Sequence, residues 1–406
     1  MADEKAVLLP LVLSLVLCEP VCWGLEHAIF NAALVETFQA AYPTAQLHFY
    51  GEAKHLDFVR AALSEATSPR IIWHPITIPP RHLYSFFKRL PQEWKLWKQM
   101  LQTTTKLQAP VLTACSGTAE SIFVLKVLLS LSLYKDQGTL IFLHSVLGNL
   151  TRKRRNPLAR IISLARVLST ANRRNLHYVV LSDSIKIEAE RLLPPIRNYL
   201  EALPFPYQFY RHETKTINAA PPLRFAFMGV GSQEKGFAWF VQLARDIHAQ
   251  YPQRAEFYLI GELHMNLTAE ESQHIITHSA GGMLPREKFD DLATTMHYSL
   301  MLHDPEFYRL IASASVLDAL LHGLPIIARR STAMESYFQV MGNIGYLVDD
   351  YTQLHNQVVA IIENPPVEEY RKQSANMLKM RQQFSPLSVA LHLKAIVDSW
   401  VQHHAR

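Results

Sequence analysis

Cysteine is scarce in this sequence. Its 406 residues include three cysteines, Cys18, Cys22 and Cys115, which are too few for the disulfide framework that supports many small secreted domains. They do not stand at metal-ligand spacing with nearby histidines. The scarcity therefore excludes a disulfide scaffold and predicts thiols that pack inside a protein kept in a reducing compartment.

Charged residues are also few. They make up 18% of the chain, whereas 49% of the residues are hydrophobic, so the composition excludes an intrinsically disordered protein. No internal repeat or low-complexity tract is present. A chain of this length exceeds one ordinary core and predicts about two to three domains.

A hydrophobic run near the N-terminus is the candidate for a targeting segment. Residues 6–18, AVLLPLVLSLVLC, form a stretch too short to span a bilayer. The residues before it, Met1 to Lys5, include two acids and one lysine, where an export signal would be basic. We interpret the run as the first buried strand of a parallel sheet rather than a signal, and we expect a cytoplasmic protein. The Asn-Leu-Thr sequons at Asn149 and Asn266 then carry no glycan.

Strand-like and helix-like segments alternate along the first half. Residues 20–43 read as a loop and a helix, and residues 45–63 as a strand, a loop and a helix. Further strands are predicted at residues 71–78, 110–117, 139–149 and 177–184. Such alternation predicts an α/β fold, with a parallel sheet covered by helices on both faces. The compositional break at residues 216–224 is the predicted linker between two halves of similar size.

The second half holds a motif suited to an anion. Residues 225–237, FAFMGVGSQEKGF, read as a buried strand, a glycine turn and a helix that begins near Lys235. Gly229 and Gly231 allow the backbone to approach a diphosphate, and the helix adds unpaired N–H groups. Lys235 supplies a mobile charge. The alternative is an ordinary strand-helix turn with a solvated lysine.

A second motif follows at residues 313–328, SASVLDALLHGLPIIA. It reads as a helix that ends at Gly323 and leads through Pro325 into a buried strand, Ile326 to Ala328. Between the two motifs lie FYLIGEL at residues 257–263, a strand ending in glycine, and GGMLPREKFDDLA at residues 281–293. Four elements of one α/β half are thus arranged in a defined order.

This order and spacing resemble the C-terminal donor domain of GT-B glycosyltransferases, in particular the retaining glycosyltransferase group 1 type. The family's strand, glycine turn and Lys-Gly pair match residues 225–236. Its acid-Ala-x-x-x-Gly-x-Pro consensus matches Asp318, Ala319, Gly323 and Pro325. The resemblance implies two facing Rossmann-like doubly wound domains. They would be residues 1–218 on the acceptor side and residues 219–406 on the donor side, with a last helix at about 386–402 that packs back on the first domain.

The implied activity is transfer of a sugar from a nucleoside-diphosphate sugar to a glycan, lipid-linked or other hydroxyl acceptor, in polysaccharide or glycolipid synthesis. No Asp-x-Asp is present, and a helix dipole together with Lys235 can neutralise the leaving diphosphate, so no metal or other cofactor is required. Asp318 is expected to bind the ribose. The donor-binding residues implied by the resemblance are Gly229, Gly231, Ser232, Lys235, Gly261, Tyr308, Arg309, Ser313, Ser315 and Asp318.

Two positions depart from the family's pattern. Retaining members often have two glutamates separated by seven residues; here the second is the shorter Asp318, and the first falls on Leu310. The arginine usual between the glycine turn and Lys235 is absent as well. Two other functions therefore stay open: a sugar-nucleotide epimerase of the same fold, and a binding protein that has lost catalysis, which Leu310 favours.

Polar residues follow the predicted strands of the first half. Ligands of such sheets bind outside the carboxyl ends of the strands, and His27 follows the first strand at a transition from loop to helix. We expect His27 to act as a general base for the acceptor hydroxyl. The alternative is a packed or solvated side chain, one of 19 histidines. The acceptor-side candidates are Gly24, Glu26, Asn31 and His144, with Ser116 and Thr118 after another strand.

A basic segment covers residues 151–174, with eight Lys or Arg and no acid. Its apolar stripe is Ile161, Ile162, Leu164, Ala165 and Leu168. A helix of this kind suits the anionic inner face of a membrane, so peripheral membrane contact is one interpretation. The other is a surface helix whose stripe packs in the core. No nucleic-acid-binding module accompanies the segment, and we expect no nucleic-acid partner.

Overall fold

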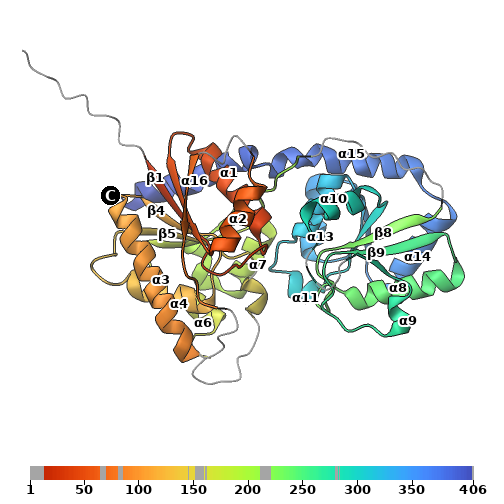
Figure 1. The fold of residues 1–406 in the computed structure, drawn as a ribbon, viewed down its shortest axis with the longest axis horizontal. Helices are drawn as coiled ribbons and strands as arrows, with labels where there is room; N and C mark the ends of the chain where they lie inside the picture. The colour runs from red at the N-terminus through yellow and green to blue at the C-terminus, as the bar shows by residue number, and fades with distance from the viewer. Residues whose placement is uncertain are drawn as a thin grey trace, which may run out of the picture. The chain divides into compact units, whose positions relative to one another are not determined.

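The computed structural model describes residues 13–64, 70–80, 86–144, 146–150, 160, 162–210, 221–278, 282 and 284–404. The chain forms two compact units (Figure 1). The first comprises Met1–Gln208 with Phe384–Arg406, and the second comprises Phe209–Gln383. The division lies before Phe209 rather than at residue 218, and residues 211–220 of the predicted linker lie outside the described residues.

The first unit is built on a parallel sheet in the order β3-β2-β1-β4-β5-β6-β7. Its strands are β1 (Ser14–Cys18), β2 (Gln46–Gly51), β3 (Ile71–Pro75), β4 (Val111–Ala114), β5 (Gly138–Phe142), β6 (Leu176–Val180) and β7 (Leu200–Ala202). The described part of the N-terminal run is therefore a buried strand, as predicted, and it lies in the middle of the sheet. The strand predicted at residues 139–149 is too long, because β5 ends at Phe142 and Val146–Asn149 is a 3₁₀ turn, η2.

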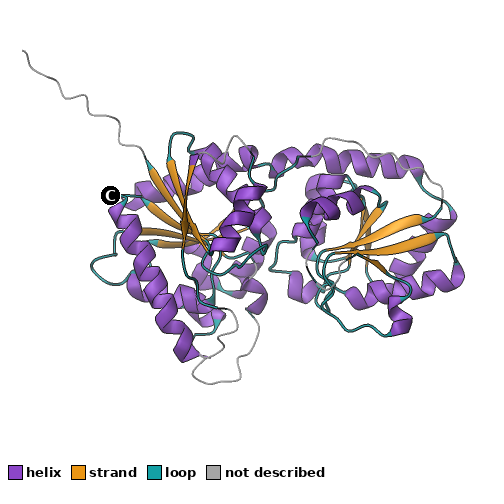
Figure 2. Ribbon diagram, in the orientation of Figure 1, coloured by secondary structure: helices purple, strands orange, loops and turns teal. Residues whose placement is uncertain are grey.

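Helices cover both faces of this sheet (Figure 2). On one side α1 (Ala28–Ala41) packs against α2 (Ala53–Ala62) and α16 (Pro386–His404), and elsewhere α4 (Ala119–Leu128) packs against α3 (Phe86–Lys106) and α6 (Leu164–Ser169). The unit is completed by α7 (Asp183–Leu192) and the 3₁₀ helix η3 (Pro194–Tyr199). The helix α16 thus brings the end of the chain back to α1. Tyr42 donates a hydrogen bond to Asp398 at 2.8 Å across that contact.

The second unit repeats the design with a six-stranded parallel sheet in the order β10-β9-β8-β11-β12-β13. Its strands are β8 (Leu223–Met228), β9 (Ala255–Ile260), β10 (Ile276–Thr277), β11 (Tyr298–Met301), β12 (Ile326–Arg329) and β13 (Gly345–Val348). Its helices are α8 (Phe237–Gln250), α9 (Ala269–Ser272), α10 (Arg286–Thr294), α11 (Pro305–Tyr308), α12 (Ala314–His322), α13 (Thr332–Met341), α14 (Tyr351–Glu363) and α15 (Val367–Phe384). Both units have the doubly wound parallel arrangement that the sequence predicts.

Three residues of the apolar stripe in the basic segment pack inside the first unit. Ile162, Leu164 and Leu168 are all buried, the last two in α6, so the core interpretation holds for these side chains. Contact of the segment with a membrane stays a prediction. Residues 151–159 and 161 lie outside the described residues.

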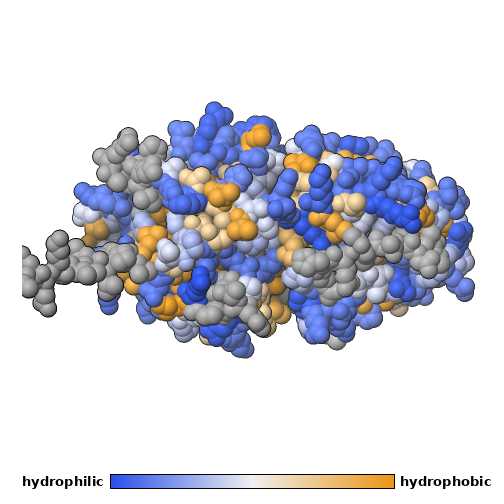
Figure 3. Space-filling model, turned by 90° about the horizontal axis from the view of Figure 1, so that it is seen from above, coloured by the Kyte–Doolittle hydropathy of each residue, from blue (hydrophilic) through white to orange (hydrophobic). Residues whose placement is uncertain are grey.

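The face in Figure 3 is mostly hydrophilic, with separate hydrophobic patches. Across the described ranges, no helix combines the length and apolarity needed to cross a bilayer. Cys18, Cys22 and Cys115 are buried, as predicted, and none of the three is in a disulfide bond.

Two leucines of α16 provide a matched test of its role in the first unit. Leu393 is fully buried at 0% exposure, whereas Leu391 is 75% exposed. We expect Leu393→Ala to lower the free energy of unfolding by about 2–5 kcal/mol. Leu391→Ala should change it by no more than about 0.5 kcal/mol. Urea unfolding followed by circular dichroism measures both, and equal losses would contradict the burial of this helix face.

Candidate functional site

The glycine turn of the second unit forms where β8 and β9 end side by side. Gly229 has a left-handed φ of 96°, which favours glycine. A Cβ on Gly261, at the end of β9, would overlap the carbonyl group of Gly229. The two backbones can therefore approach this closely because Gly261 lacks a side chain. The contact lies at the carboxyl edge of the sheet, where doubly wound folds bind their ligands.

Lys235 places its ammonium group directly over this turn. A Cβ on Gly229 would lie 2.9 Å from Lys235 Nζ and 3.3 Å from Ser315 Oγ. Lys235 is partly buried. Burial lowers the pKa of its ammonium group, and the negative charge of Asp318 opposes that shift. The site thus contains a cation that an anionic ligand would favour.

The N-terminus of α12 lies at the same edge. Ser313 is the N-cap residue, but its side chain makes no capping hydrogen bond. Ser315 Oγ instead donates to the carbonyl of Met228 at 2.9 Å, which ties the first turn of α12 to the end of β8. The helix ends at Gly323 with a left-handed φ of 60°, and Arg381 donates to the carbonyl of Leu320 at 2.8 Å. The positive end of the helix dipole therefore faces the glycine turn.

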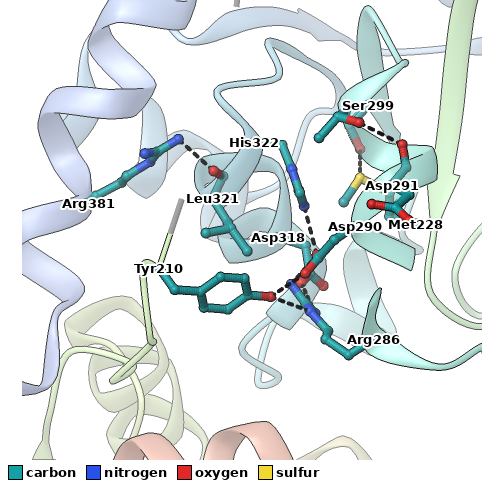
Figure 4. A network of polar contacts seen from close by, with 11 residues as sticks. Tyr210, Met228, Arg286, Asp290, Asp291, Ser299, Asp318, Leu321, His322 and Arg381 are labelled. Carbon is teal, nitrogen blue, oxygen red and sulfur yellow. Dashed lines mark hydrogen bonds and ion pairs between the residues drawn. The ribbon is translucent and has the colours of Figure 1, made fainter. Parts of the chain in front are cut away.

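Asp318 is the predicted ribose ligand, and it is already part of a polar network (Figure 4). Arg286 Nη1 donates to Asp318 Oδ1 at 2.7 Å. Arg286 begins α10, and sequence reasoning missed it because two of its partners, Tyr210 and Asp318, lie elsewhere in the chain. Its segment had been matched to a donor-site element, which was the available signal.

The other predicted donor residues fall into two groups. The residues in the turn have structural contacts. Gly231 lies against the ring of Phe237, and the backbone carbonyl of Ser232 accepts hydrogen bonds from the N–H groups of Lys235 and Phe237. The residues that follow β11 contact near neighbours in the sequence. The rings of Tyr308 and His303 are stacked with their centroids 4.2 Å apart, and Arg309 Nη1 lies 3.2 Å from Glu306 Oε2.

Two residues between β11 and α12 add to the sequence interpretation. Leu310, at the position of the family's first glutamate, is buried at 3% exposure, and its side chain has no group that could hydrogen-bond to a ligand. His303 was missed. It is buried directly after a strand, and burial together with the charge of Lys235 lowers its pKa to about 3. His303 therefore stays neutral beside the lysine.

In the first unit, the structure brings two predicted residues together. His27 has a left-handed φ of 52° and precedes α1, and its ring lies 4.4 Å from the ring of His144 in an edge-on arrangement. Glu26 lies 3.8 Å from His27 Nε2. Gly24 is left-handed as well, with a φ of 53°. Residues that follow β1 and β5 thus meet at one edge of the sheet.

Glu19, the residue directly after β1, organises this edge. It is 0% exposed. Its Oε1 accepts from the N–H groups of Val21 and Cys22 at 2.9 and 3.0 Å and from the Ser116 hydroxyl. Its Oε2 accepts from Asn31 Nδ2 at 3.0 Å. Asn31, a predicted acceptor-side residue, is itself buried, and its side-chain amide supports the loop through Glu19.

One group of side chains could supply metal ligands, although the spacing of cysteines and histidines in the sequence did not predict it. Within the described residues, Cys22, Glu26 and His27 form the group whose ligand atoms all lie within 4.8 Å of one another. The sequence interpretation missed it because the chain turns back through the left-handed residues Gly24 and His27. Thiolate, imidazole and carboxylate are zinc-type ligands, and these three residues are the ones that could hold such an ion.

Comparisons with known proteins place this geometry in context. No protein-family model and no curated protein sequence matches the chain. Its structure is similar to HepE of Anabaena, solved in complex with UDP, with a TM-score of 0.66 and 12% identity over 96% of this chain and 100% of that one. It is also similar to the sucrose-phosphate synthase of Thermosynechococcus elongatus, with a TM-score of 0.62 and 15% identity over 96% of this chain and 100% of that one.

A third similar structure is WaaG, a glycosyltransferase involved in lipopolysaccharide biosynthesis, with a TM-score of 0.60 and 11% identity over 95% of this chain and 99% of that one. The chain has the GT-B fold. The fold prediction made from four motifs is thus confirmed. In this GT-B chain, Gly229, Lys235, Ser315 and Asp318 gather at the carboxyl edge of the second sheet.

Glu19 offers a test of how the His27 loop is held. Glu19→Ala removes the acceptor of four hydrogen bonds and leaves buried donors without a partner, so we expect a loss of about 2–4 kcal/mol in the free energy of unfolding. Asp57→Ala is the control, because its side chain is 73% exposed and pairs with the exposed Arg60 in the helix α2. A Glu19 variant as stable as the control would refute the role given to this carboxyl.

Proposed function

We propose that this protein is a glycosyltransferase that takes a sugar from a nucleoside-diphosphate sugar. The observation that carries the proposal is the convergence, within the second unit, of a cation and a helix N-terminus with a carboxylate. Lys235 Nζ lies over Gly229 and beside Ser315, and Asp318 is close enough to Lys235 to affect its pKa. A diphosphate and a ribose require these two kinds of group side by side.

Each part of the donor is assigned to a part of the site. Lys235 and the first-turn N–H groups of α12 neutralise the diphosphate, which comes close to the backbone at Gly229. Asp318 accepts from the ribose hydroxyls. UDP is the proposed nucleotide, because similar GT-B structures were solved with UDP and UDP-glucose. The proposed chemistry needs no metal, since the leaving diphosphate already meets a cation and a helix dipole.

The acceptor is assigned to the first unit. In the proposed step an acceptor hydroxyl oxygen forms a bond to the anomeric carbon, and the bond from that carbon to the diphosphate oxygen breaks. The diphosphate leaves with the electron pair, and His27 takes the hydroxyl proton. His144 packs against the His27 ring and orients it. Glycan and lipid-linked hydroxyls are the proposed acceptor classes.

One observation favours a second candidate, a donor-binding protein without transferase activity. Leu310 occupies the position of the first glutamate and is buried in the core. A protein of this kind would bind the nucleotide sugar and neither transfer the sugar nor slowly hydrolyse the donor. Incubation with donor and analysis of released nucleotide separates the two functions.

Removing the ammonium group tests the donor site. Lys235→Ala should weaken donor binding by about tenfold to a hundredfold, because a charge-assisted contact to the diphosphate contributes about 1.5–3 kcal/mol. Calorimetry and thermal shifts against UDP-, GDP-, ADP- and CMP-sugars measure the affinity. The control is Lys372→Ala, which removes an exposed lysine of the same unit. If both variants bind every donor as the parent protein does, the assignment fails.

The lowered pKa of Lys235 predicts how donor affinity depends on pH. Below that pKa the ammonium group is charged and attracts the diphosphate, so affinity should fall as pH rises through it, at a pH below the ordinary lysine value of 10.5. Donor binding should also take up protons in that range, because the diphosphate favours the charged form. Lys235→Arg should bind donor with a flatter profile up to pH 10, since guanidinium stays protonated. Calorimetry in buffers of different ionisation enthalpy tests both statements, and identical pH profiles would contradict them.

A further inference from the structure

Arg286 is held in the second unit by three different partners (Figure 4). Its Nη1 donates to Asp318 Oδ1 at 2.7 Å, its Nη2 lies 3.1 Å from Asp290 Oδ1, and its Nε donates to the Tyr210 hydroxyl at 2.7 Å. The guanidinium also lies 4.8 Å from the centre of the Phe289 ring. Each nitrogen of the guanidinium group therefore has a polar partner, which leaves the side chain little conformational freedom.

Asp290 is the buried support of this arrangement. It is 2% exposed, and it accepts from the Tyr210 hydroxyl at 2.6 Å and lies 3.0 Å from His322 Nε2. Burial raises the pKa of Asp290, but the contacts with His322, Arg286 and Tyr210 outweigh burial and hold the pKa below its ordinary value. A charged carboxylate inside the unit thus fixes the guanidinium from one side.

On its other side the guanidinium group contacts Asp318, the proposed ribose ligand. Asp318 comes from α12, whereas Arg286 and Asp290 come from α10. The pair therefore links two helices at the edge where the nucleotide is proposed to bind. An exposed ion pair would contribute little, but this one is partly buried and belongs to a network.

We propose that Arg286 is the positioning residue of the ribose site. It holds the short carboxylate of Asp318 in the orientation that receives the ribose hydroxyls, and Asp290 and Tyr210 hold Arg286 in turn. The inference rests on the proposed function, because it requires a nucleotide at this edge. Its specific consequence is discrimination between ribose and deoxyribose, separate from affinity for the diphosphate.

The test compares binding of UDP, GDP and ADP with their 2′-deoxy and 3′-deoxy forms, and with inorganic pyrophosphate, by calorimetry. The parent protein should bind a ribose nucleotide about tenfold to a hundredfold more tightly than the deoxy form that lacks the recognised hydroxyl. Arg286→Met, which keeps the length of the side chain, should reduce that ratio to less than about threefold. Its pyrophosphate affinity should stay within about twofold of the parent value.

Lys235→Ala is expected to show the opposite pattern. It should lose affinity for pyrophosphate and for nucleotides together. Its ratio of affinities for ribose and deoxyribose nucleotides should stay at the parent value, because independent sites contribute additively. Tyr210→Phe removes one hydroxyl from the network and should give an intermediate ratio. If Arg286→Met does not fold, Arg286→Lys and Tyr210→Phe replace it in the test. Guanidinium ion added to Arg286→Ala should restore the ratio of affinities.

The outcomes separate the two levels of the argument. A parent protein that binds none of these nucleotides overturns the proposed function and this inference with it. A parent protein that discriminates ribose from deoxyribose, with Arg286 variants that keep the same ratio, overturns the inference alone. An Arg286→Met protein that loses pyrophosphate affinity and ribose discrimination to the same extent shows a general structural role and also overturns it.

Discussion

The close approach of two backbones at the end of β8 and β9 is the constraint on which the second unit's site depends. There is no room for a Cβ on Gly261 beside the carbonyl of Gly229, so the two strands can end together only with a glycine at position 261. Lys235 then fills the space above Gly229, and Ser315 ties the first turn of α12 to the same point. A cation and a helix N-terminus are placed side by side as a result of packing at one edge.

Each unit also has a buried carboxyl group that organises its edge. Glu19 in the first unit receives donors from its own loop, from α1 and from the loop before α4. Asp290 in the second unit receives Tyr210 and lies against His322 and Arg286. A buried acid of this kind is costly unless its partners are complete. The segments that supply those partners, the His27 loop and the ends of α10 and α12, are therefore held in defined positions.

Much of the fold could be predicted because it depends on local patterns. Short apolar strands alternating with helices, and glycines at the turns, predicted parallel sheets without any contact information. The resemblance of four motifs to the donor domain of GT-B glycosyltransferases then implied the GT-B order. One error was local as well: the strand predicted at residues 139–149 is too long, since apolar residues continue into a 3₁₀ turn. The stripe of the basic segment left a membrane surface and the core as alternatives, and Ile162, Leu164 and Leu168 pack in the core.

The sequence by itself determined the sheets, the glycine turn with Lys235 and the helix that carries Asp318, because spacing along the chain encodes secondary structure and turns. Only the tertiary structure decided the partners. The meeting of His27 with His144, the grouping of Cys22 with Glu26 and the clamping of Asp318 by Arg286 join residues whose side chains meet only when the chain turns back or separate elements pack together. Electrostatic contacts of this kind depend on distance in space, which linear spacing does not encode.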